Sequence, residues 1–384
     1  MRRASRALGY VASAALLLAA LSACGDDDPE TEPASSPTTG AASTPATDDG
    51  PTGTPSTSSS PAAPAGGPAD RPTALEAATD LLDWQGVPGP VRDTVTRSGE
   101  WTLEVDANGA GASLEGPSSA SGSGSSGERV SDALIDGDYA VVVMQDKAEQ
   151  RPSSAEVTDL ATGRSFTIDG RSDVPTTNGG TWALGGGRLL HATIDRGAYC
   201  LASVDLETRK SSLGWCAPKR HGFNAAHITP AGDSMMTFDD SHPSCRTVVT
   251  VVGDRTEPFP GAARCKAWEG LLVDGGAVWS VVPNERRIED VHFYARQDDG
   301  YFDLGPGTAG TLVWCGGASY FVRDPQRDGD PAELMRWSAE DGLSVAYRSP
   351  GGQAFLAEPR CGGDTITVTA LAEQGDEQVS APVS

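Results

Sequence analysis

Residues with the chemistry for catalysis or metal binding are few and scattered in this sequence. It contains no His-Glu-x-x-His, Gly-x-Ser-x-Gly or phosphate-loop motif. One region does gather the ligand types that zinc prefers, namely His221, His227, His242, Asp239 and Asp240. Lone histidines in polar loops are commoner than metal ligands, so we predict no metal site, no catalytic residue and no cofactor.

The acidic stretch from Asp324 to Asp330 is a second candidate for cation binding. Its sequence, Asp-Pro-Gln-Arg-Asp-Gly-Asp, places carboxylates around a glycine. A calcium loop of the EF-hand type needs ligands at fixed positions, and that spacing is absent here. We therefore interpret the stretch as a solvated loop between two strands.

One arrangement recurs along the chain: a short apolar segment, a turn that contains glycine, and a second apolar segment. It is clearest in the ten residues from Val313 to Val322. The glycines that anchor the turns are Gly137, Gly186, Gly232, Gly275, Gly316 and Gly362. Successive anchors lie 41 to 49 residues apart. An all-β repeat of about 45 residues is typical of the blades of a β-propeller.

The repeat predicts an all-β propeller over residues 100–384 with six blades, each with four antiparallel strands that we call A to D. The last copy lacks an outer hairpin, whereas Trp101–Leu114 forms a spare one that turns at Asn108-Gly109. We expect this hairpin to complete the last blade, because ring closure removes exposed sheet edges. Counting Gly99 as a further anchor gives seven blades.

The pattern resembles the broad group of WD40, TolB-like and quinoprotein-like propellers of bacterial surface lipoproteins. The resemblance covers about residues 100–384 and concerns architecture, since no Trp-Asp dipeptide closes a blade. It therefore implies a fold and little about function.

Six cysteines follow residue 24, and an even number in an exported chain indicates disulfides. In the blade register, Cys200 begins strand C of one blade and Cys216 follows its strand D. Cys245 and Cys265 occupy the same two places one blade later. Because strands C and D are antiparallel neighbours, we expect each of these pairs to bond.

The other two cysteines, Cys315 and Cys361, lie at equivalent A–B turns of consecutive blades. A bond between them would join two blades, provided that their Cα atoms lie within about 7 Å of each other.

The basic residues of the long loops fall on one face, because D–A and B–C loops share one side of a propeller. We expect this face to contact an anionic wall polymer, a carboxylate or an envelope protein. The predicted contacts are Lys219, Arg220, Arg286, Arg287 and Arg327. Alternatively, nearby acids such as Asp290 and Asp324 neutralise them in surface ion pairs that contribute little.

The N-terminus combines a positive segment with an apolar run that is too short for a stable membrane span. It ends in Leu21-Ser22-Ala23-Cys24, which resembles the lipobox of bacterial lipoproteins. The resemblance implies a signal peptide over residues 1–23 and acylation of Cys24, with palmitate as the expected lipid. The protein would then be anchored at the outer face of the cytoplasmic membrane. An ordinary secretory signal is the alternative.

Residues 24–71 are predicted to be a disordered tether into the cell wall. From Gly25 to Asp70 there is no Val, Ile, Leu, aromatic residue, Lys or Arg, so the stretch cannot bury enough apolar surface to fold. In the lead-in over residues 72–99, Thr73 and Glu76 form a capping box that predicts a short helix to about Trp84.

Composition narrows the functional classes. The net charge of −24 argues against nucleic acid and anionic membrane surfaces as general partners. We predict a monomeric, non-catalytic binding or scaffolding module. The alternatives are an accessory component of an envelope complex and a propeller enzyme (a hydrolase, lyase or quinone-dependent dehydrogenase). Several carboxylates or histidines converging on the central channel would favour the enzyme.

Overall fold

The computed structural model describes residues 71–383, apart from residues 118–119, 124–125, 285 and 352–353. The chain divides into a unit Met1–Ala62 and a unit Ala63–Ser384, and all described residues lie in the second. The predicted signal peptide, Cys24 and the tether up to Asp70 lie outside the described residues. No helix in the described part of the chain has the length and apolar character that a membrane crossing requires.

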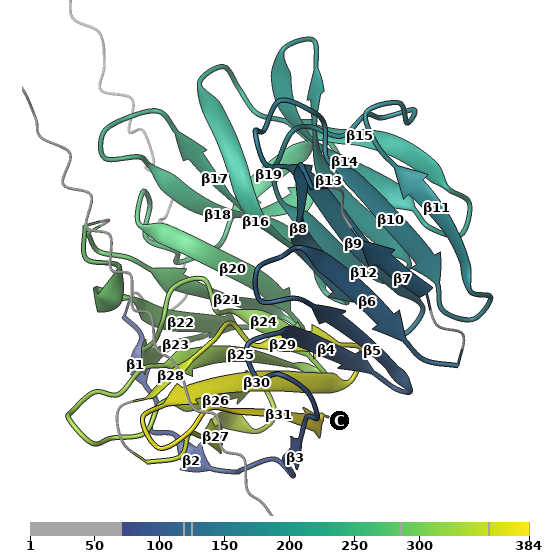
Figure 1. Ribbon diagram of the computed structural model, residues 1–384. Helices are drawn as coiled ribbons and strands as arrows, with labels where there is room; N and C mark the ends of the chain where they lie inside the picture. The colour runs from purple at the N-terminus through teal and green to yellow at the C-terminus, as the bar shows by residue number, and fades with distance from the viewer. Residues whose placement is uncertain (1–70, 118–119, 124–125, 285, 352–353, 384) are drawn as a thin grey trace, which may run out of the picture. The chain divides into compact units, whose positions relative to one another are not determined.

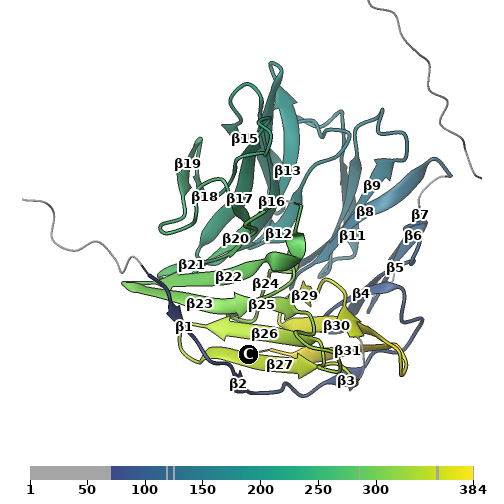
Figure 2. The ribbon, with the colours of Figure 1, turned by 90° about the vertical axis from the view of Figure 1, so that its left-hand side faces the viewer.

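The second unit is a seven-bladed β-propeller (Figures 1 and 2), so the larger of the two predicted blade counts is confirmed. Blade 1 contains β4 (Thr94–Ser98), β5 (Trp101–Val105), β6 (Gly111–Glu115) and β7 (Ala120–Ser123). Blade 2 contains β8 (Glu128–Ile135), β9 (Tyr139–Asp146), β10 (Ser154–Asp159) and β11 (Arg164–Ile168). Blade 3 contains β12 (Trp182–Gly185), β13 (Arg188–Asp195), β14 (Ala198–Asp205) and β15 (Lys210–Cys216). Blade 4 contains β16 (His221–Thr229), β17 (Gly232–Asp239), β18 (Arg246–Val252) and β19 (Arg255–Pro258).

Each of the remaining three blades includes a strand from the N-terminal segment. This strand is the fifth in blades 5 and 6 and the fourth in blade 7. Blade 5 contains β20 (Ala267–Val273), β21 (Gly276–Val281), β22 (His292–Gln297) and β23 (Gly300–Pro306), with the short 3-10 helix η1 (Ile288–Asp290) before β22. Blade 6 contains β24 (Val313–Cys315), β25 (Ala318–Arg323), β26 (Glu333–Ser338) and β27 (Gly342–Arg348). Blade 7 contains an interrupted inner strand, β28 (Ala354–Leu356) and β29 (Arg360–Gly362), followed by β30 (Thr365–Ala372) and β31 (Glu377–Pro382).

The segment Thr73–Gly86, which we call the strap, runs along the outer edges of blades 5, 6 and 7 (Figure 2). Its strands β1 (Thr73–Ala74) and β2 (Ala78–Thr79) pair in parallel with β23 and β27, and β3 (Gln85–Gly86) pairs antiparallel with β31. The helix predicted over this segment is therefore wrong. A lone helix of this length is marginal in water, whereas the open blade edges supply hydrogen-bond partners and the cores of blades 5–7 receive its apolar side chains.

The predicted closure of the ring is also wrong. The hairpin Trp101–Leu114 does not complete the last blade, because it pairs with Thr94–Ser98 through a turn at Gly99 and forms blade 1. The last blade obtains its third strand from Glu377–Pro382, and β3 of the strap is its fourth. The propeller is thus closed by the outermost strand of blade 7.

Apolar clusters fill six of the seven blade interfaces, from the interface of blades 1 and 2 to that of blades 6 and 7. Among the described residues, no comparable cluster joins blades 7 and 1. Polar contacts cross that seam instead: Gln378 donates to the carbonyl of Asp93 at 2.9 Å, and Arg97 to the hydroxyl of Ser380 at 3.3 Å. The inner strands approach closely there, since a Cβ on Gly362 would lie 2.2 Å from the carbonyl oxygen of Arg97.

Candidate functional site

The three predicted disulfides are confirmed. Cys200 bonds with Cys216 across strands C and D of blade 3, where the two residues are register partners. Cys245 and Cys265 flank the same two strands in blade 4 and are also bonded.

The third bond joins Cys315 in β24 to Cys361 in β29, with the Cα atoms 5.7 Å apart. It connects the inner strands of blades 6 and 7, and both strands line the centre of the propeller.

The five predicted basic contacts do fall on one face, which we call the basic rim. Lys219 and Arg220 lie in the loop before β16, Arg286 and Arg287 in the loop before β22, and Arg327 in the loop before β26. Acidic neighbours partly neutralise them: Arg220 pairs with Asp240 and Arg287 with Asp290 at 2.9 Å. Within the described residues, the side chains of Lys219, Arg286 and Arg327 form no ion pair.

The histidines and aspartates considered as metal ligands do not gather into one group. His221 begins β16 opposite Asp239 and is exposed, His242 is exposed in a loop, and Nε2 of His227 is enclosed further along β16. Asp239 accepts hydrogen bonds from Ser241 and from the Cys245 backbone, and these bonds lower its pKa to about 2. Its carboxylate therefore stabilises the conformation of the loop that follows β17. No group of three potential ligands is found among the described residues.

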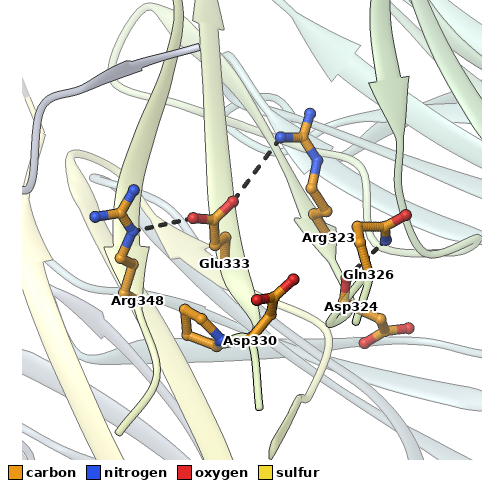
Figure 3. Close-up of a pocket in the computed structure, with 7 residues that line it drawn as sticks. Arg323, Asp324, Gln326, Asp330, Glu333 and Arg348 are labelled. Carbon is orange, nitrogen blue, oxygen red and sulfur yellow. Dashed lines mark hydrogen bonds and ion pairs between the residues drawn. The ribbon is translucent and has the colours of Figure 1, made fainter. Parts of the chain in front are cut away.

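A small pocket of about 360 Å³ lies at the strands of blade 6 (Figure 3). Its wall includes the stretch Asp324–Asp330, and Glu333 lies between Arg348 at 3.0 Å and Arg323 at 3.8 Å. Arg323 also donates to the carbonyls of Leu304 (2.9 Å) and Pro306 (3.1 Å) in blade 5. The hydrogen bonds of Arg323 join blades 5 and 6. Most charged groups in the pocket wall therefore already have partners within the protein, which leaves few for a ligand.

The larger cavity, of about 760 Å³, is the central channel. Residues from the inner strands of the blades line it, and its volume falls within the range of small-ligand sites. Among the lining residues are two tryptophans and a set of charged groups: Trp182, Trp314, Asp132, Glu269, Glu358 and Arg360.

Several of these polar groups lie the same number of residues before the A–B turns of their blades. Each A–B turn is closed by a pair of residues, and the residue four positions before the first member of that pair defines a set that we call the channel ring; in blade 2 the closing pair is Asp136 and Tyr139. The ring is Thr94, Asp132, Thr181, Ala225, Glu269, Thr311 and Glu358, and all but Thr94 and Thr311 line the channel. Bulges in β8, β16 and β20 fall beside these positions, and bulges commonly re-aim a side chain.

Two members of the ring hold the next blade in place. Glu269 is buried and accepts the backbone N–H groups of Gly310 (2.9 Å) and Leu312 (3.1 Å), together with the hydroxyl of Ser280 (3.2 Å). Thr181 accepts the N–H of Ala226 at 2.9 Å. These side chains satisfy backbone donors at the channel edge of an inner strand, donors that have no further strand to pair with.

Asp132 and Glu358 are less engaged by the scaffold. Burial raises the pKa of Asp132 to about 7, against the opposing effects of a Ser131 hydrogen bond and of Arg360, and Glu358 raises it further. Glu358 forms an ion pair with Arg360 at 3.1 Å. The electrostatic influence of Arg360 and Glu358 on Asp132 places the three groups in one neighbourhood, on blades 2 and 7.

Two further polar atoms of residues in the cavity wall have no hydrogen-bond partner within the described part of the chain. Nε2 of His227 and Nε of Arg360 are both enclosed by protein. Burial lowers the pKa of His227 to about 4, so its imidazole is neutral at physiological pH. We call Asp132, His227, Glu358 and Arg360 the channel site; together they can donate and accept hydrogen bonds and exchange a proton near neutral pH.

The sequence-based interpretation missed most of this site. It placed His227 in a polar loop and did not single out Asp132, Glu358 or Arg360. A signal was nevertheless present, because Asp132 and Glu269 interrupt apolar segments shortly before the glycine anchors. The anchors alone do not align these positions, since Asp132 lies five residues before Gly137 and Glu269 six residues before Gly275.

Comparisons with known proteins agree on the fold. No protein-family model matches the chain, and no curated protein matches its sequence. The β-propeller domain of the Trilobed protease from Pyrococcus furiosus is 10% identical, with 75% of this chain and 93% of that chain covered and a TM-score of 0.52. This likeness shows the β-propeller fold alone.

Other solved structures are similar at lower scores. TolB from Acinetobacter baumannii is 10% identical, with 76% and 79% of the two chains covered and a TM-score of 0.40. An oligogalacturonate lyase in complex with manganese is 13% identical, with 80% and 99% covered and a TM-score of 0.48. The chain spans about half the length of a matched prolyl endopeptidase, 47% of which is covered.

Proposed function

We propose that this chain is an extracytoplasmic lipoprotein, anchored through Cys24 at the outer face of the cytoplasmic membrane, whose propeller binds a ligand in its central channel without transforming it. The lipobox-like sequence and three disulfides support an exported protein. The observation that carries the binding function is the contrast within the channel ring. Glu269 and Thr181 accept backbone N–H groups of the next blade, whereas the carboxylates of Asp132 and Glu358 accept none among the residues that the structure describes.

The channel is favoured over the basic rim for physical reasons. Its wall consists of strands whose blades are packed against their neighbours, so little conformational freedom is lost when a ligand enters. The rim consists of loops whose Arg220 and Arg287 already have acidic partners. We retain the rim as the proposed contact with an envelope protein or an anionic wall ligand, with Lys219, Arg286 and Arg327 as the main contributors.

A propeller enzyme is the second candidate, and Asp132 is the observation that favours it. A carboxyl group with a pKa of about 7 can donate a proton at neutral pH, and Glu358 beside it can accept one. Such a pair suits acid–base chemistry of the hydrolase or lyase type.

The test begins with the full-length chain in detergent and a panel of envelope-derived small molecules. Binding is measured by thermal shift, and any ligand found is incubated with the protein and analysed for chemical change. We expect binding that is weakened at least tenfold by Asp132→Asn and Glu358→Gln and unaffected by Asp254→Asn, a matched change at an exposed turn. Conversion of the ligand that stops in Asp132→Asn would instead establish the enzyme.

The anchor is tested separately with Cys24→Ala. We expect this variant to leave the membrane fraction and to keep an unprocessed signal segment. A variant that remains firmly membrane-bound, with unchanged processing, would show that Cys24 is not the anchor.

A further inference from the structure

We propose that the central channel selects a small organic cation that carries N–H donors, such as a primary amine, held by Asp132 and Glu358. This inference rests on the binding function proposed above and specifies the chemistry of its ligand. Three observations support it: the charge of the channel wall, the hydrogen-bonding groups that face the cavity, and the position of an aromatic ring.

The channel wall carries an excess of negative charge. The titratable and charged groups that line it are Asp132, Asp136, His227, Glu269, Glu358, Arg188 and Arg360. Both cations are already paired: Arg188 makes two hydrogen bonds to Asp233, at 2.8 and 2.6 Å, and Arg360 binds Glu358. A concave wall lined mainly by one sign of charge focuses the electrostatic field and so attracts a cation.

The carboxylates of the channel site accept hydrogen bonds, so a ligand that fits them must carry hydrogen-bond donors. Asp132 accepts no backbone N–H group among the described residues, and the second oxygen of Glu358 is available beside its ion pair with Arg360. An ammonium group supplies several donors from one atom and so fits the carboxylate oxygens of Asp132 and Glu358.

An aromatic ring completes the site. Trp314 lines the same cavity and is only partly buried, one residue before the disulfide-bonded Cys315. The face of an indole attracts an alkylammonium group placed within about 6 Å. A cavity lined by carboxylates and a tryptophan therefore favours an organic cation over a bare metal ion, which gains little from the ring.

Binding of a cation is expected to release a proton. The cation interacts best with ionised Asp132, whose pKa is about 7 in the empty channel. Below that pH the ligand competes with the proton, and the affinity should fall up to tenfold per pH unit. His227 remains neutral over this range because its pKa lies at about 4.

The experiment is a calorimetric titration of the full-length chain in detergent at pH 6 and pH 8. The probes are 1,4-diaminobutane, tetramethylammonium, calcium, glucose and acetate. We expect diaminobutane to bind more tightly than the other four, about tenfold more tightly at pH 8 than at pH 6, with a proton released at pH 6. Asp132→Asn and Glu358→Gln should each weaken it at least tenfold, whereas Asp254→Asn should not.

The outcomes separate this inference from the proposed function. If glucose or acetate binds more tightly than diaminobutane, and the same variants lose this binding, the ligand is not a cation but the channel remains a binding site. Tighter binding of calcium or tetramethylammonium would overturn the role of the N–H donors. If diaminobutane binds both variants as tightly as the wild type, and their thermal unfolding is unchanged, the binding site does not lie in the channel. Failure of diaminobutane to bind at millimolar concentration overturns the inference.

Discussion

The carboxylate of Glu269 accepts the backbone N–H of Leu312 at 3.1 Å, across the interface between blades 5 and 6. Thr181 and Ala226 repeat this relationship between blades 3 and 4, at the same position of the channel ring. A polar side chain on one inner strand thus replaces the missing strand partner of the next. The propeller uses these ring positions both to join its blades and to place polar groups in its centre.

Replacing Glu269 tests this role. Glu269→Ala leaves the buried N–H group of Leu312 without a partner, whereas the N–H of the exposed Gly310 can bind water. We expect the free energy of unfolding, measured by urea denaturation, to fall by about 1–3 kcal/mol, the cost of one unsatisfied buried donor. Glu269→Gln keeps one acceptor and should lose less. An unchanged midpoint in Glu269→Ala would show that the carboxylate does not join the blades.

The same residue predicts a dependence of stability on pH. Burial raises the pKa of Glu269 from 4.5 to about 7, so the folded state binds a proton more tightly than the unfolded chain. Protonation of Glu269 in the folded state contributes on the order of 3 kcal/mol to the free energy of unfolding. This contribution is fully present below pH 4.5 and is lost as the pH rises through about 7. Denaturation of the wild type between pH 5 and 8 should show this loss, and Glu269→Gln should flatten it. Equal slopes in the two proteins would contradict the prediction.

The strap makes a measurable contribution to stability through Trp84. Its indole N–H donates to the carbonyl of Ala346 at 2.8 Å, and its ring meets Tyr347 edge-on at 5.2 Å. Trp84→Ala should lower the free energy of unfolding by about 2–4 kcal/mol. Leu81→Ala is the matched control, since Leu81 lies in the same strap with 53% of its surface exposed. Equal thermal shifts in the two variants would show that the strap is only loosely attached.

Parts of this fold were predictable because their signal is local. Blades 2 to 6 repeat an apolar strand, a glycine turn and a second apolar strand. The strand register inferred from this repeat also predicted which cysteines are bonded. Blade 1 was harder to predict, because its inner strand Thr94–Ser98 contains one apolar residue, Val95. Strand β31 was missed for a similar reason, since Glu377–Pro382 consists mainly of polar and small residues.

Other parts depend on residues that are distant in the sequence. The two-residue strands β1 and β2 have no periodicity of their own and form only beside the edges of blades 5 and 6. The channel site combines side chains from three blades, and no single copy of the repeat contains it. The sequence therefore predicts the blades much better than it predicts their common centre.

The disulfide between Cys315 and Cys361 should matter more than the two within single blades. It closes a segment with a sequence separation of 46 residues, compared with 16 for Cys200 and Cys216. In the chain-entropy account, replacing both Cys315 and Cys361 by Ser should cost about 4 kcal/mol, and the corresponding change at Cys200 and Cys216 about 3 kcal/mol. Urea denaturation without reductant measures both. A larger loss from the shorter segment would show that native-state contacts, rather than chain entropy, dominate.

The basic rim provides the last prediction, which concerns a macromolecular partner rather than the channel ligand. Arg286 and Arg287 lie in the loop before β22, and Asp290 neutralises Arg287 in part. Charge reversal of both arginines to Glu should weaken capture of anionic wall polymer at least tenfold in 0.05 M salt. The difference from the wild type should shrink in 0.3 M salt, because exposed charges are screened within about 10 Å at 0.1 M. Arg164→Glu combined with Lys210→Glu, at the exposed first residues of strand D in blades 2 and 3, makes the same change in net charge and is the control. Equal affinities of the reversed and wild-type proteins at both salt concentrations would identify this rim as ordinary solvated surface.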